Sequence, residues 1–203
     1  MFEMLLGGQE INYMLARLQK YGVVTKGPAL VVGSETTTVK GSLDFKNNAN
    51  AFIKIGDGLP VDTRIGDATN FYIDTHVKLR SNAPQMLIGN LRNSNGTGSY
   101  WITLNNTFQV ASQISLDGYD TAGAVQRFRF GTGTLPLNTW LHIRLQRIGA
   151  ELKFYLNGTQ VGATQTMQKG FGGNTTNQLY VGKTTDNAFL MNGLIDDLYF
   201  EVG

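Results

Sequence analysis

Residues 135–163, LPLNTWLHIRLQRIGAELKFYLNGTQVGA, contain two runs in which apolar and polar side chains alternate, with turn residues between them. In residues 141–146 and again in residues 152–156 the period is two, as expected of strands with one buried face. The second run ends in Asn157-Gly158, a dipeptide that accepts positive φ at both central positions of a type I′ turn. The segment therefore predicts an antiparallel meander of two strands and the start of a third, with one apolar face.

Similar alternation recurs beyond residue 40, where no helical period appears. Strands without intervening helices exclude a βαβ layout and leave an antiparallel sandwich or barrel. With this many strands we expect an all-β fold, a two-sheet antiparallel jelly-roll sandwich. The predicted strands are Ser42–Phe45, Ala51–Ile55, Phe71–Leu79, Met86–Leu91, Tyr100–Leu104, Phe108–Ser115, Val125–Phe130, Trp140–Ile148, Leu152–Leu156, Leu179–Val181 and Leu194–Val202.

Ahead of the strands, residues 9–21 predict a short helix that Gly22 ends. Its apolar stripe follows the i, i+3, i+4, i+7 pattern and consists of Ile11, Met14, Leu15 and Leu18. Because so short a helix is marginal alone in water, the stripe docks either on its own domain or on another chain. We expect a helix and arm for docking or assembly at 1–35, followed by the jelly-roll domain at 36–203.

Composition limits the classes of partner. A net charge of +2 with dispersed basic residues favours neither nucleic acid nor a membrane. The chain has no Cys, so it has no disulfide framework and no thiolate metal site.

The first residues, MFEMLLGGQE, lack the basic start of a secretory signal, and their apolar run is too short to span a membrane. We expect a product that is made in a cytoplasm and reaches any outside location without a signal peptide.

Four elements follow one another along the chain: Ser42–Phe45 with Ala51–Ile55; Phe71–Ile73 with Val77–Leu79; Asn138–His142 with Phe154–Gly158; and Leu179–Gly182 with Phe189 and Gly193–Leu198. In this order they resemble the concanavalin A-like, laminin-G-like jelly-roll family over about residues 40–203. Two departures are Val77, where the family often has Trp, and Asn157, where it often has Asp. The resemblance implies a fold and a tendency to bind glycans or proteins, sometimes with calcium, but the same fold also hosts glycosidases.

The residues argue against catalysis. A glycosidase needs two carboxylates roughly 5 to 10 Å apart, and in jelly-roll glucanases they sit on one strand as an alternating Glu, Asp, Glu set. None of the five Glu residues begins such a set. The two histidines lie on different predicted strands without a helical HExxH arrangement, so a zinc site has no support. We therefore expect no enzyme activity, and we expect Trp140 and His142 to be structural.

Candidate ligand-binding residues lie in loops that mix aromatic and amide side chains, because aromatic faces stack on sugars while amides and carboxylates bind hydroxyls. They are Asn95, Tyr100, Asp117, Tyr119, Asp120 and Asn174. We expect Tyr100 and Tyr119 to be exposed and Trp101 to belong to the core. The two carboxylates of the segment 116–120 are read first as turn formers. We expect no cofactor other than calcium. The resemblance implies that Asp196 is a candidate calcium ligand, and hydrogen bonding of its carboxylate to neighbouring loop amides is the alternative.

Three functions remain open from the sequence. The first is a non-catalytic virion structural protein of a bacteriophage, a capsid decoration, tail or fibre component. It would assemble with other virion proteins or with its own copies through the N-terminal segment and could bind a cell-surface glycan. The second is a lectin-like carbohydrate-binding module of a cellular protein, for which an extracellular location is the alternative to the virion. The third, a glycoside hydrolase, is disfavoured by the missing carboxylate set.

Overall fold

The computed structural model describes residues 42–47, 51–55, 65–67, 69–90, 99–107, 111–120, 122–171, 179–184 and 187–202. Within these residues the chain forms thirteen strands and no helix, and the strands build two antiparallel sheets. The predicted all-β sandwich is thereby confirmed. The helix and arm predicted for 1–35 lie outside the described residues, so the assembly stripe of Ile11, Met14, Leu15 and Leu18 stays a prediction.

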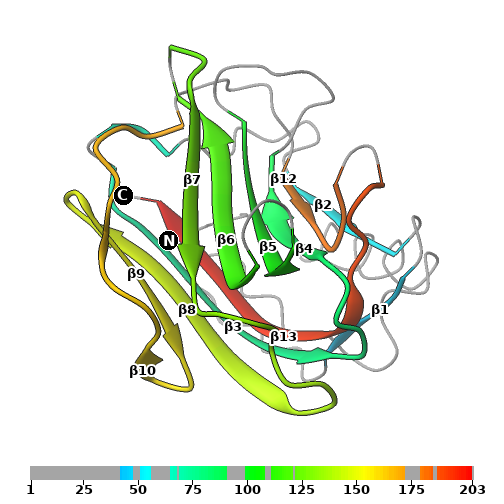
Figure 1. Ribbon diagram of the computed structural model, residues 1–203. Coiled ribbons are helices and arrows are strands. Elements are labelled where there is room, and N and C mark those ends of the chain that lie inside the picture. Colours follow the sequence, from blue (N-terminus) through cyan, green and yellow to red (C-terminus); the bar gives the residue numbers. More distant parts are fainter. Residues whose placement is uncertain are drawn as a thin grey trace, which may run out of the picture.

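One sheet has seven strands in the order β1-β13-β3-β8-β9-β10, with β11 also paired to β9. Its long strands β3, β8 and β13 curve behind the second sheet, which faces the viewer in Figure 1. The strands of the seven-stranded sheet are β1 (Leu43–Lys46), β3 (Phe71–Leu79), β8 (Trp140–Ile148), β9 (Glu151–Leu156), β10 (Thr159–Gln160), β11 (Gln165–Thr166) and β13 (Asn192–Val202).

The other sheet has six strands in the order β2-β12-β4-β5-β6-β7. Consecutive hairpins from β4 to β7 form its larger part, drawn in green in Figure 1. Its strands are β2 (Ile53–Ile55), β4 (Gln85–Gly89), β5 (Tyr100–Asn106), β6 (Ser112–Tyr119), β7 (Val125–Phe130) and β12 (Leu179–Val181).

The core lies between the two sheets and comes from the inward residues of the alternating strands. In β3 the predicted inward face is buried throughout and the other residues are half-buried. Across the six-stranded sheet, one row of paired inward residues runs through Ile53, Val181, Ile88, Ile102, Leu116 and Phe128. Burial of such rows removes apolar area from water at about 25 cal/mol per Å² and is the main stabilising term.

The β9–β10 turn has the geometry that its sequence predicts. Asn157 has φ 50° and Gly158 has φ 80°, so both central residues are left-handed as a type I′ turn requires. The Asn157 side chain also accepts a 2.9 Å hydrogen bond from the backbone N–H of His142 on the neighbouring strand β8. The turn therefore fixes the register of β8 and β9 at that end of the sheet.

Arg147 occupies a core-facing position of β8 and is 1% exposed. Its guanidinium donates to the backbone carbonyls of Gly149, Gly66, Thr69, Met167 and Asp67, at 2.8 to 3.2 Å for the first four. Burial lowers the pKa of this side chain from its usual value, and the Asp67 carboxylate acts in the opposite direction. A buried cation with this many acceptors fastens two loops to the end of β8.

One predicted strand was placed wrongly. The sequence favoured a strand at Phe108–Ser115 followed by a loop at residues 116–120, whereas β6 spans Ser112–Tyr119. Asp and Gly are depleted in strands, which is why Asp117 and Gly118 suggested a loop. In the fold, a Cβ at Gly118 would lie 2.3 Å from the Phe171 ring, so only glycine fits in the strand beneath that ring. Tertiary packing therefore overrides the local preference.

Candidate functional site

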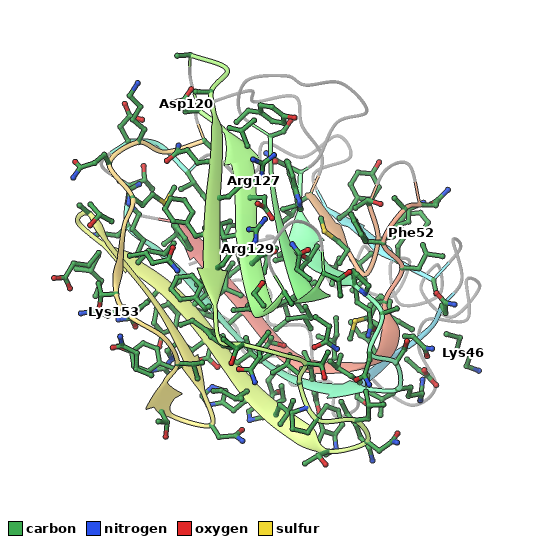
Figure 2. All side chains as sticks on the ribbon, viewed as in Figure 1. Lys46, Phe52, Asp120, Arg127, Arg129 and Lys153 are labelled. Carbon is green, nitrogen blue, oxygen red and sulfur yellow. The ribbon has the colours of Figure 1, made fainter. Side chains whose placement is uncertain are left out.

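The outer face of the six-stranded sheet, turned away from the core, carries a group of side chains that we call the outer-face cluster. The register aligns Trp101 of β5, Asp117 of β6 and Arg127 of β7 in one row across three neighbouring strands. Arg129 follows in the next outward row, and Tyr119 lies beyond Asp117 along β6. Figure 2 labels Arg127 and Arg129 on this side of the sheet.

The charged part of the cluster centres on Asp117. Its Oδ1 lies 2.7 Å from Nη1 of Arg129 and 3.9 Å from Nε of Arg127, and its side chain is 3% exposed. Burial raises the pKa of the Asp117 carboxyl above its usual value, while Arg129, the Ser115 hydroxyl and Arg127 act in the opposite direction. Arg127 is 42% exposed. The cluster thus presents a guanidinium to solvent beside a fixed ion pair.

A network of short polar side chains lies next to the ion pair. The hydroxyls of Thr103 and Ser115 are 2.6 Å apart, and the side-chain amide of Asn106 donates to Ser115 Oγ at 2.6 Å. All three side chains are buried. Buried and mutually bonded groups hold their rotamers, so they give the cluster a rigid floor.

The aromatic part consists of Trp101 and Tyr119. Their ring centroids are 6.0 Å apart with planes tilted by 46°, and both residues are half-buried. Half-exposed rings next to hydrogen-bonding groups are suited to a sugar, whose C–H face packs on a ring while its hydroxyls reach polar atoms.

The expected exposure of two neighbouring aromatic residues is reversed. Tyr100 is fully buried and its ring stacks on Phe171 with centroids 5.8 Å apart, whereas Trp101 is half-exposed on the outer face. The alternation along the strand could have shown this. Tyr100, Ile102 and Leu104 are spaced two residues apart, so they share one face of the strand, and that face is turned to the core. The prediction that Tyr100 is an exposed ligand platform is therefore wrong.

Asp120 is a turn former, as the first reading of its loop predicted. Its Oδ1 accepts hydrogen bonds from the backbone N–H groups of Ala122 and Ala124 at 2.9 and 2.8 Å. These two bonds hold the pKa of Asp120 below its usual value, and the bond from Ala124 has the larger effect. Asp117 differs, because it lies within β6 rather than in a turn.

Sequence reasoning missed the two arginines of the cluster. Arg127 and Arg129 alternate with the inward residues Phe128 and Phe130, so the alternation along β7 was enough to predict that both arginines lie on the outer face of the sheet. That they meet Asp117 depends on the β6–β7 register, which the sequence does not specify. Of the remaining candidates, Asn95 and Asn174 lie outside the described residues.

The candidate calcium ligand Asp196 lies on the outer side of the seven-stranded sheet. Its Oδ1 accepts a 3.0 Å hydrogen bond from the backbone N–H of Asp197, which has φ 49° at a bulge of β13. Burial raises the pKa of Asp196, and the neighbouring Asp197 raises it further. Among the described residues no group of three or more His, Cys, Asp or Glu side chains could hold a metal ion. Calcium at Asp196 stays a prediction.

On the same outer side, Asp74 joins β3 to β8. His142 Nε2 lies 2.5 Å from Asp74 Oδ1, and Arg144 donates to Asp74 Oδ2 at 2.8 Å through Nε. His142 also stacks on His76 with ring centroids 4.8 Å apart. These contacts join neighbouring strands of one sheet, and the structural role of His142 stays a prediction.

The described part of the chain contains no helix long and apolar enough to cross a membrane. A family model described as the concanavalin A-like lectin/glucanases superfamily matches residues 47–201. No curated protein matches the chain.

Solved structures share the fold at low sequence identity. Domain 4 of an extracellular GH43 arabinanase from Geobacillus stearothermophilus, in complex with arabinotriose, has a TM-score of 0.54 and 16% identity, with 86% of this chain and 79% of that chain covered. The botulinum neurotoxin serotype G binding domain has a TM-score of 0.55 and 14% identity, covering 79% and 39%. Mouse laminin alpha1 domains LG4-5 have a TM-score of 0.52 and 11% identity, covering 83% and 43%. The chain thus spans less than half of the last two structures, and at these identities the likeness shows the fold alone.

Proposed function

The chain belongs to the concanavalin A-like lectin/glucanases superfamily, and from that premise we propose that it is a non-catalytic glycan-binding module whose binding surface is the outer-face cluster. The observation that carries the proposal is the half-exposed Trp101–Tyr119 pair beside the Asp117–Arg129 ion pair. The rings supply apolar contact, and Arg127 supplies N–H donors for hydroxyl or carboxylate oxygens of the glycan.

Two relatives of the fold support a binding role. One structure was solved in complex with arabinotriose and another is a neurotoxin binding domain, by their own descriptions. For this chain the ligand class that the cluster favours is an oligosaccharide with a hydroxyl or carboxylate directed at Arg127. Because the guanidinium of Arg127 is exposed, we expect an acidic sugar to bind more tightly than its neutral counterpart at low salt.

We also propose that the outer-face cluster binds glycans without hydrolysing them. A glycosidase needs one carboxyl as acid and a second as nucleophile or base on either side of the bond. In the cluster, Asp117 is the carboxyl, and its Oδ1 is paired by charge with Arg129 at 2.7 Å and lies 3.9 Å from Arg127. We therefore expect no release of reducing ends from a bound oligosaccharide.

The setting that we propose is the virion of a bacteriophage, as a capsid decoration, tail or fibre component. Its support is the amphipathic stripe of residues 9–21 ahead of the domain, which suits docking on other virion proteins or on copies of the chain. The test compares the molecular mass in solution of the purified protein before and after removal of residues 1–30. If the protein is a monomer in both forms and the shortened form binds glycan with full strength, the assembly role is contradicted. The alternative is a lectin-like module of a cellular protein, acting outside the cell.

The binding surface is tested by glycan-array screening, followed by calorimetry with the best neutral and acidic oligosaccharides. Trp101→Ala and Arg127→Gln should each weaken binding by roughly tenfold or more, since truncated anchors commonly cost about 1.4 kcal/mol or more. Trp140→Ala is the matched control, because Trp140 is a 41% exposed Trp on the opposite sheet. Equal loss in the Trp101 and Trp140 variants, or no loss in either, would place the site elsewhere.

A further inference from the structure

A separate cavity of about 230 Å³ opens at the end of the sandwich where β1 and β3 end and β4 and β13 begin. We call it the rim pocket. The residues that line it come from the segment after β1, from the β3–β4 loop with the start of β4, and from the segment before β13 with the start of that strand. Those used below are Asn47, Ser81, Ala83, Gln85, Asn187, Phe189 and Asn192. It lies at the Gln85 end of β4, whereas the outer-face residue Trp101 pairs with Gly89 at the other end.

The pocket is held in shape by hydrogen bonds between its segments. The fully buried Gln85 accepts a bond from the backbone N–H of Asn192 at 2.6 Å and donates to the carbonyl of Ser81 at 2.6 Å. The backbone N–H of Asn47 donates to the Met191 carbonyl at 2.9 Å. One buried amide thus joins two of the three segments and a backbone bond joins the third, so the cavity is preformed.

The segment before β13 is fixed in the same way by Thr184. The buried Thr184 hydroxyl accepts a 3.1 Å hydrogen bond from the backbone N–H of Phe189, and the backbone carbonyl of Thr184 accepts one from the backbone N–H of Asn187 at 3.1 Å. Asn187 has φ 59° and Asn47 has φ 52°, the left-handed conformation that Asn tolerates better than most residues. Lys183 Nζ donates to Asn187 Oδ1 at 3.2 Å. The Asn187 oxygen is therefore engaged, while no described residue accepts a hydrogen bond from its side-chain N–H groups, which can donate to a ligand.

The chemistry of the lining is neutral and rich in amides. Every described residue that lines the pocket is uncharged. The side-chain amides of Asn47 and Asn192 make no hydrogen bond to another described residue, and each offers both donors and an acceptor. Phe189 adds an apolar face that is half-exposed.

We propose that the rim pocket is a second binding site, independent of the outer-face cluster, that takes one neutral hydroxylated ring such as a terminal monosaccharide. Amides that both donate and accept match hydroxyl groups, and Phe189 matches the C–H face of the ring. None of the described lining residues carries a charge that would select an ion. The volume lies below the roughly 300 Å³ at which sites for drug-sized ligands begin, which limits the ligand to about one sugar ring.

The test uses the full chain, ¹⁵N-labelled, titrated with the methyl glycosides of glucose, galactose, mannose and arabinose. At least one glycoside should give saturable shifts of the side-chain amide signals of Asn47, Asn187 and Asn192. Ala83→Trp should abolish these shifts, because Ala83 lines the pocket and an indole would fill it. Asn47→Gly keeps the left-handed backbone and removes one amide, so it should weaken affinity roughly two- to tenfold.

Ala163→Trp is the matched control, since Ala163 is also an exposed loop alanine and does not line the pocket. It should bind like the unmodified chain, and so should Trp101→Ala. Failure of all four glycosides to give saturable shifts overturns the proposal, as does binding that Ala83→Trp leaves intact. Loss of these shifts in Trp101→Ala overturns the independence of the two sites. Loss of oligosaccharide binding in Trp101→Ala with intact pocket shifts supports both sites separately.

Discussion

Asp117 and Arg129 form an ion pair 2.7 Å long on neighbouring strands β6 and β7, with 3% and 15% of their side chains exposed. The pair lies on the outer face of a sheet rather than in the core between the sheets. Removing two charges from water is costly and is offset only when the geometry is good and other polar groups assist. Here Arg127 and the Ser115 hydroxyl also stabilise the carboxylate. Such a pair holds its side chains fixed next to Trp101, which favours a preorganised binding surface.

The first prediction concerns the pH dependence of stability. Burial raises the pKa of Asp117 in the folded state above 3.8, its value in the unfolded chain. Between these two pKa values the folded state binds more protons than the unfolded state, so this group makes stability fall as pH rises through that window. Asp117→Asn should remove this decline, which urea unfolding at a series of pH values from about 3 to 7 would measure.

Asp120→Asn is the control of opposite sign. The pKa of Asp120 is lowered in the folded state, so its contribution is present above 3.8 and is lost as pH falls through the lowered value. The stability difference between wild type and Asp120→Asn should therefore shrink as the solution is acidified. Parallel pH profiles for the two variants would contradict the assignment of burial as the dominant influence on Asp117.

The second prediction concerns Arg147. Arg147→Met should destabilise the domain by about 3 to 5 kcal/mol, because backbone carbonyls such as those of Gly66, Thr69 and Met167 would remain buried without their donor. Thermal and urea unfolding measure the change. Lys153→Met, which removes an exposed pair with Glu151, should leave the midpoint nearly unchanged. A similar small effect for both variants would show that the carbonyls find other partners.

The third prediction concerns the β9–β10 turn. Asn157→Ala should cost about 1 to 2 kcal/mol, because alanine is strained at φ 50° and lacks the acceptor for the His142 N–H. Asn157→Gly keeps the conformation and loses the hydrogen bond alone, so it should cost less, about 0.5 to 1.5 kcal/mol. Chemical denaturation of the two variants in parallel checks the order. Equal costs would mean that backbone strain contributes nothing.

The fourth prediction concerns Gly118. A Cβ there would lie 2.3 Å from the Phe171 ring and 2.7 Å from the Ser99 carbonyl, so Gly118→Ala should destabilise by about 1 to 3 kcal/mol or more. Adding Phe171→Leu removes the ring and should recover part of the loss relative to Phe171→Leu alone, a coupling that a double-mutant cycle measures. Strict additivity would contradict a direct clash between residue 118 and the ring.

Much of the fold could be predicted because the relevant information is local. Strands β3, β7, β8 and β12 have the predicted bounds, since a strand with one buried face must alternate and turn residues mark its ends. The Asn157-Gly158 turn followed from the φ values that these residues tolerate. Parity would even have placed Tyr100 inside and Trp101 outside, had Ile102 and Leu104 been used to orient the strand.

The candidate site could be predicted only in part. Asp117 and Tyr119 were named from the sequence as loop residues, yet they lie in β6 because Gly118 is needed beneath Phe171. The arginines that complete the cluster reach Asp117 only through the register of β6 with β7. The rim pocket is formed by segments that include residues 47, 85 and 192, which no sequence period connects.

For strands with strict alternation, such as β3 and β8, the sequence by itself determined which side chains face the core, and it determined the turn at Asn157-Gly158. Both depend on neighbours within a few residues and on allowed backbone angles. Tertiary structure alone decided which outward residues meet. Asp117 and Arg129 become partners through the register of the β6–β7 hairpin, and Gln85 meets Asn192 because the beginnings of β4 and β13 lie side by side in the fold. Their chemistry depends on burial and distance, which are properties of the packed sandwich rather than of any segment of the chain.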